Sequence, residues 1–165
     1  MRPLDENEIR ASFVNCSKGE AGRLSVPKPL DAVRWPDLDY LGWRDPGAPD
    51  RGYLVAELDD RLVGVTLRAP SGPRKSFLRS NLCSICVTSH AGSGVALLTA
   101  RKAGPAGREG NTVGAYLCAD LACSLYVRGL KRSGQAQRIE ETLTLDEQLA
   151  RTRANLDAFL AQVLV

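Results

Sequence analysis

The sequence has few of the residues on which many functional sites depend. It contains one histidine, and only 5% of its residues are aromatic. One histidine leaves no evident pairing with a nucleophile, and no Gly-Lys-Ser or Gly-Lys-Thr phosphate-binding motif occurs, so we do not expect an enzyme. The low aromatic content also gives little material for a surface that binds nucleic acids by stacking on their bases.

Long hydrophobic runs are also missing. No apolar run approaches the ~20 residues that a membrane-spanning helix requires, and no apolar leader precedes Arg2, so we expect a cytoplasmic protein. The net charge of +3 permits contact with RNA, the ribosome or an acidic protein without requiring one. With 165 residues and 44% hydrophobic content, the chain is long enough for one domain, which we expect to span residues 1–165.

Four of the five cysteines form two close pairs. Two residues separate Cys83 from Cys86, and four separate Cys118 from Cys123. Zinc favours four soft or borderline ligands in a tetrahedron, and a Cys-x2-Cys knuckle supplies two of them. The wider second pair fits the same site if Cys118 ends a strand and Cys123 lies in the first turn of a helix. This arrangement predicts a structural zinc ion in a treble-clef finger over about residues 81–130.

Other interpretations of these cysteines are open at this point. The odd number of cysteines and the missing leader count against disulfides. A catalytic dithiol usually opens a helix, whereas Cys86 is followed by Val87-Thr88-Ser89. Four unrelated buried thiols are the third alternative. His90 either replaces one cysteine as a ligand or neighbours the site, and Cys16 stands apart as a small core residue.

The hydrophobic pattern predicts an α+β fold, in which helices flank a small antiparallel sheet. Strands are expected at 52–58, 61–68, 94–101 and 111–118. Helices are expected at about 5–17, 122–129 and 144–163. Asp59-Asp60 is a short polar turn that makes the first two strands a hairpin. Thr144, with Glu147 three residues later, has the signature of a capping box at the start of the last helix.

The segment between Pro27 and Pro49 is too rich in proline to form a long helix. It carries Trp35 and Trp43, and we expect at least one of these rings to lie in the core, although exposed rings would instead anchor a partner. The stretch 69–80 combines proline, glycine and basic residues, and we expect an exposed loop there.

Several runs together resemble a known family. They are residues 9–15, 41–46, 83–86 and 114–124. The four-cysteine pattern is the most specific part of this resemblance, which covers nearly the whole chain. The sequence is similar to the C-terminal zinc-finger domain of the elongation-factor-G-binding proteins, the FusB type associated with fusidic acid resistance.

The resemblance implies a small α/β domain with structural Zn²⁺ held by Cys83, Cys86, Cys118 and Cys123. It also implies binding to the C-terminal part of elongation factor G and release of that factor from ribosomes stalled by fusidic acid. The resistance proteins carry an additional N-terminal helical bundle, whereas this sequence opens in the zinc-finger-domain pattern. Factor binding is therefore a stronger expectation than resistance. An RNA- or ribosome-binding zinc finger is the alternative function.

We expect the partner-binding surface to consist of basic residues around the finger, with Tyr126 as an aromatic anchor. The basic candidates are Lys75, Arg79, Arg101, Lys102, Arg108, Arg128, Lys131 and Arg132. Each of them is also explained as an ordinary solvated surface charge. Neither a membrane nor a small-molecule substrate is expected as a partner.

Overall fold

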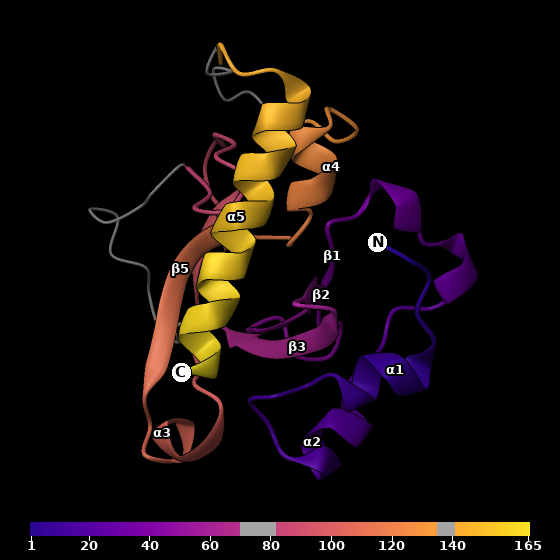
Figure 1. Ribbon diagram of the computed structural model, residues 1–165, viewed down its shortest axis with the longest axis vertical. Helices are drawn as coiled ribbons and strands as arrows, with labels where there is room; N and C mark the ends of the chain where they lie inside the picture. The colour runs from indigo at the N-terminus through magenta and orange to yellow at the C-terminus, as the bar shows by residue number, and fades with distance from the viewer. Residues whose placement is uncertain (70–81, 135–140) are drawn as a thin grey trace.

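The computed structural model describes residues 1–69, 82–134 and 141–165, as shown in Figure 1. Its helices and strands, in chain order, are α1 (Glu6–Ala11), α2 (Lys18–Arg23), η1 (Leu30–Ala32), η2 (Trp35–Asp37), β1 (Tyr40–Arg44), β2 (Arg51–Leu58), β3 (Arg61–Arg68), β4 (Val95–Arg101), α3 (Gly104–Arg108), β5 (Thr112–Cys118), α4 (Cys123–Val127) and α5 (Leu145–Leu164). Within the described ranges, no helix is both long and apolar enough to cross a lipid bilayer. The predicted loop 69–80 lies outside the described residues, apart from its first residue.

The strands form one five-stranded antiparallel sheet in the order β1-β2-β3-β4-β5. The predicted hairpin of β2 and β3 is confirmed, and its turn residues Asp59 and Asp60 have φ angles of 48° and 59°. Two consecutive residues with positive φ match the twist of a two-residue hairpin. β3 and β4 pair only at Leu67↔Ala100 and Arg68↔Thr99. The sheet therefore consists of two ribbons, β1–β3 and β4–β5, that are joined at one end.

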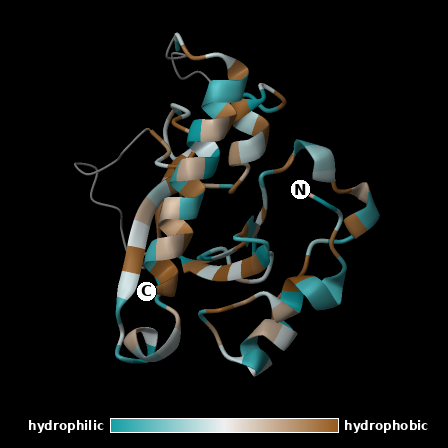
Figure 2. Cartoon of the chain, viewed as in Figure 1, coloured by the Kyte–Doolittle hydropathy of each residue, from teal (hydrophilic) through white to brown (hydrophobic). Residues whose placement is uncertain are grey.

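Both faces of the sheet are covered, and each face has its own hydrophobic cluster. α5 lies along β5 and beside α4 (Figure 1), and its Leu156 and Leu160 are fully buried in the cluster that includes Leu54, Leu98 and Leu117. Hydrophobic and hydrophilic residues alternate around α5 in Figure 2, as expected for a helix with one buried face. The prediction of a capping box at Thr144 and Glu147 is confirmed. So is the α+β fold with a small antiparallel sheet.

The second cluster lies beneath α1 and α2, on the opposite face. The ring centroids of Trp43 and Tyr53 lie 5.1 Å apart with their planes tilted by 39°, and Phe13 meets both rings edge-on. Trp35 and Trp43 are both buried, which confirms the expectation that these rings serve the core. Strand β1, which carries Trp43, was not predicted, because five residues between prolines give little signal until they pair with β2. Cys16 is half-buried and packs against this cluster.

The first helix is shorter than predicted. α1 ends at Ala11, so the expectation of a helix to about Ser17 is wrong. The chain leaves the helix because Ser12 and Val14 form backbone hydrogen bonds with Gly64, at 2.8 and 2.9 Å. A Cβ atom at Gly64 would lie 2.4 Å from Ser12 Oγ, so this approach requires glycine.

A candidate metal centre

Three different segments bring the four predicted ligands together. Cys83 and Cys86 lie on the tight turn before β4, with the Val87 N–H donating to the Cys83 carbonyl at 3.0 Å. Cys118 is the last residue of β5, and Cys123 is the first residue of α4. These are the positions that the sequence predicted for the second pair.

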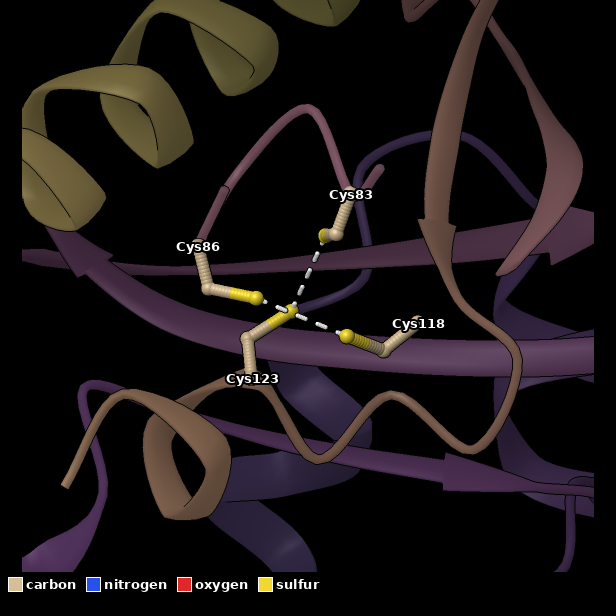
Figure 3. Close-up of side chains that lie close together, drawn as sticks. All are labelled: Cys83, Cys86, Cys118 and Cys123. Atoms are coloured by element: carbon tan, nitrogen blue, oxygen red, sulfur yellow. Dashed lines mark hydrogen bonds between the residues drawn. The ribbon is translucent and has the colours of Figure 1, made fainter. Parts of the chain in front are cut away.

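The four sulfur atoms converge on one point, as Figure 3 shows. All four lie within 4.8 Å of one another, with Cys83–Cys123 and Cys86–Cys118 separations of 3.6 and 3.5 Å. Tetrahedral zinc with Zn–S bonds of about 2.3 Å places its sulfurs roughly 3.8 Å apart. The donor set therefore fits one zinc ion, which Cys83, Cys86, Cys118 and Cys123 are placed to bind.

The same geometry argues against the three other interpretations of the cysteines. All of the thiols are free, so none of them forms a disulfide. The four clustered thiols are buried, with at most 2% of any residue exposed, which denies a substrate the access that a catalytic dithiol needs. Their convergence also distinguishes them from unrelated core cysteines.

The four clustered sulfurs need a cation between them if all of them are to be ionised. Hydrogen bonds from Cys118, Cys123 and Cys86 lower the pKa of Cys83. Hydrogen bonding with Cys123, together with burial, raises the pKa of Cys118. Sulfurs this close cannot all be ionised without a cation between them. Tyr40 Oη, next to Cys123, is buried and has no hydrogen-bond partner among the described residues. A thiolate at Cys123 is an acceptor for it.

Backbone strain also concentrates at the site. Val87 and Leu121 adopt positive φ angles of 57° and 60°, a conformation that is costly for residues with large side chains. Val87 directly follows Cys86, and Leu121 lies in the loop between Cys118 and Cys123. Such strain, on the order of 1–3 kcal/mol per residue, persists where surrounding contacts impose it. Here the strained residues belong to the two turns that carry the cysteine ligands.

His90 neighbours the site, and the clustered metal-ligand set consists of the four cysteines among the residues that the structure describes. The His90 ring is buried, and its Nε2 lies 3.2 Å from Cys118 Sγ. Burial lowers the pKa of His90 and favours a neutral ring that can donate to the sulfur. A Cβ atom at Gly94 would lie 2.6 Å from His90 Cβ, so Gly94 makes room for this ring.

Asp120 connects the ligand loop to the segment after α4. Its carboxylate accepts hydrogen bonds from the Ala122 N–H at 3.1 Å, from Tyr126 Oη at 2.8 Å and from Lys131 Nζ at 2.7 Å. Burial opposes the charged form, but Lys131 and Tyr126 outweigh it and lower the pKa of Asp120. Asp120 and Tyr40 were not predicted from the sequence. Asp120 lies within the turn from Cys118 to Leu121, and an aspartate between two cysteines was a weak signal, whereas Tyr40 gave none.

The candidate partner-binding residues do not form one surface. Arg101, Lys102 and Arg108, the α3 group, lie at the α3 end of the molecule. The α4 group, at the opposite end, consists of Tyr126, Arg128, Lys131 and Arg132 (Figure 1). In that second group, Lys131 and Arg132 are exposed. Lys75 and Arg79 lie outside the described residues.

Three members of the α4 group have structural partners, and Lys131 is one of them through its ion pair with Asp120 at 2.7 Å. The side chain of Arg128 is only 18% exposed and is paired with Asp39. The Tyr126 ring meets His90 edge-on at 4.6 Å, and its hydroxyl is bonded to Asp120. These contacts explain all three side chains without a partner protein.

A knuckle, a β-hairpin and a helix that supplies the last ligand define a treble-clef zinc finger, here with four cysteine ligands. The FBP C-terminal treble-clef zinc-finger family matches residues 8–163, and the chain belongs to this family. Neither a curated protein nor a solved structure matches the chain.

Proposed function

We propose that this protein binds translation elongation factor G and promotes its release from the ribosome. The observation that carries the proposal is the family membership over residues 8–163, together with the resemblance of the same residues to the factor-binding domain of the FusB type. The proposal places the protein in the cytoplasm, where translation takes place. Resistance to fusidic acid is a further consequence that depends on the release step.

The metal centre supports a binding role over an enzymatic one. Four thiolates complete the tetrahedral shell of a zinc ion and leave no position for a reacting water. Metal binding then contributes folding free energy, on the order of 10 kcal/mol for such sites. The protein acts by differential affinity, because a ligand shifts an equilibrium toward the state that it binds more tightly.

The segment after α4 is the part of the finger best suited to contact the factor. Leu130 is 46% exposed and is followed by the exposed side chains of Lys131 and Arg132. An exposed apolar residue beside two cations offers both burial and charge complementarity to an acidic protein surface. Arg101 and Arg108 of the α3 group are exposed as well. Charge-reversal variants at the two ends of the molecule can therefore be compared with each other.

Isothermal titration of the zinc-loaded protein into elongation factor G from the same source tests the proposal. We expect binding at micromolar affinity or tighter, weakened by the double variant Leu130→Ala/Arg132→Glu and unchanged by Arg101→Glu/Arg108→Glu. The reverse pattern would move the contact surface to the α3 end. Absence of binding to the free factor and to the factor–ribosome complex would refute the proposal.

RNA binding is the alternative, and the same protein preparation distinguishes it. An RNA-binding finger would retain ribosomal RNA fragments without any factor, with an affinity that falls steeply as salt increases. The modest net charge of +3 argues for a shallow salt dependence and for the protein partner.

A further inference from the structure

A group of arginines gathers on one face of the sheet, at the end remote from the cysteines. Arg51 on β2 lies directly opposite Arg68 on β3, and Arg68 lies opposite Thr99 on β4. Arg101, two residues after Thr99, projects from the same face, because side chains alternate along a strand. From Thr112, opposite Arg101, to Cys118 is six steps along β5, or about 20 Å. This cluster is therefore separate from the metal centre.

The arginines line a cavity of about 400 Å³. Its floor is formed by the polar end of the sheet, and α2 contributes Arg23 to its wall. The aromatic side chains under α1 and α2 cover the neighbouring part of the same face but stop at Tyr53, which borders the cavity. Cavities of a few hundred Å³ are the size of small-molecule binding sites.

The positive charge in this cavity is not balanced by its acidic residues. Glu20 accepts hydrogen bonds from the Ser17 backbone and hydroxyl, within the capping box of α2. Asp45 accepts from Tyr53 Oη at 2.7 Å and from two backbone amides in its own turn. Hydrogen bonding leaves both carboxylates charged, so they balance two of the four arginines that line the cavity, which keeps a net charge of +2.

The arginines have correspondingly few ionic partners. In the described part of the chain, no ion pair within 4.0 Å involves Arg23, Arg51 or Arg101. Arg68 reaches Asp50 at 3.7 Å, but both side chains are at least half exposed and such pairs contribute little. Like charges directly opposite each other on neighbouring strands are destabilising, as Arg51 and Arg68 are here. An anion held between the two arginines would offset this repulsion.

We propose that this cavity binds a small molecule through a phosphate group. The guanidinium groups come from α2, β2, β3 and β4, so their N–H donors approach from several directions. A planar carboxylate is satisfied by one bidentate arginine, whereas the tetrahedral phosphate group offers oxygens toward several of them. Thr112 lines the same cavity and provides a neutral hydroxyl donor, whereas the Thr99 hydroxyl already donates to the Arg68 carbonyl at 3.2 Å. This site is independent of the factor-binding function proposed above.

Calorimetric titration of the zinc-loaded, full-length protein with pyrophosphate and with inorganic phosphate, at constant ionic strength, tests the proposal. We expect saturable binding of one anion per chain. Arg51→Gln and Arg68→Gln should each weaken binding about tenfold, as expected for the loss of a charge-assisted hydrogen bond. Arg61→Gln is the matched control, because Arg61 is an exposed arginine at the far end of β3.

Thermal stability provides a second readout that a structural role for the arginines would not produce. Without anion, Arg51→Gln should leave the Tm unchanged or raise it, because it relieves the like-charge pair. With pyrophosphate, the wild type should gain more in Tm than the variant. Lack of saturable binding, equal weakening by Arg61→Gln, or malonate binding as tightly as pyrophosphate would each overturn the assignment of a phosphate site.

Discussion

Arg128 and Asp39, 89 residues apart in the sequence, form an ion pair through two hydrogen bonds of 2.6 and 2.9 Å. Ser124 Oγ also accepts a hydrogen bond from the Asp39 N–H at 2.9 Å. Both contacts join α4, whose first residue is the ligand Cys123, to the segment that leads into β1. They fasten the metal-binding helix to the opposite edge of the sheet.

We predict that Arg128→Gln lowers the free energy of unfolding by about 1.5–3 kcal/mol, the usual contribution of hydrogen bonds to charged groups. The two side chains are only 18% and 15% exposed, so solvent does not replace the lost partner well. Urea denaturation of the zinc-loaded protein measures the change. Arg132→Gln removes an exposed arginine from the same region and should have little effect. Equal stability of the two variants would show that the pair does not fasten α4.

Two glycines provide a matched test of the packing between β1 and the ligand loop. A Cβ atom at Gly42 would lie 2.6 Å from the Leu121 carbonyl oxygen, whereas one at Gly22 in α2 would meet nothing within 4 Å. Gly42→Ala should therefore destabilise the protein by about 1–3 kcal/mol through overpacking. Gly22→Ala should stabilise it by about 0.5–1 kcal/mol through helix propensity.

Thermal denaturation of both glycine variants measures these effects. Because Leu121 precedes the ligand Cys123 by two residues, Gly42→Ala should also speed the loss of zinc to a chelator. A Gly42→Ala protein with wild-type stability and zinc retention would contradict the close approach of the loop to β1.

Acid stability should depend on Asp45. The Tyr53 hydroxyl, followed by the Gly47 and Ala48 amides, lowers the pKa of this carboxyl group in the folded state. Ionised Asp45 therefore contributes stability that is complete above its unfolded pKa, about 4. That contribution is lost as the pH falls through the folded pKa.

We expect Asp45→Asn to flatten the decline of Tm between about pH 4 and pH 2. Asp31→Asn, which changes an exposed aspartate, is the control and should keep the wild-type slope. The same slope in Asp45→Asn would mean that the Tyr53 contact does not persist in solution. The reciprocal effect is on Tyr53, whose pKa is raised to about 12 by burial and by Asp45.

The parts of the fold that the sequence predicted are those with local signals. Cys-x2-Cys and the later pair identified all four metal ligands, because zinc chemistry restricts their type and spacing. The β2–β3 hairpin and the start of α5 followed from a polar turn and a capping box. Each of these signals lies within a few residues of the feature that it specifies.

The parts that the sequence did not predict depend on contacts between distant residues. The end of α1 is set by the hydrogen bonds of Ser12 with Gly64, and α3 lies between the predicted strands 94–101 and 111–118, where Pro105 suits a first helical turn. The structural role of Arg128 depends on Asp39. A count of basic residues gave no sign that their positions separate into two ends of the molecule.

The zinc content of the purified, reduced protein tests the central claim most directly. Elemental analysis should find one zinc per chain in the wild type and in Cys16→Ser, because Cys16 lies outside the cluster. Cys123→Ser should lose the ion at low chelator concentration and unfold at lower temperature. A folded, fully reduced wild type without metal, or a Cys123→Ser variant that retains zinc as tightly as Cys16→Ser, would contradict the four-cysteine zinc centre.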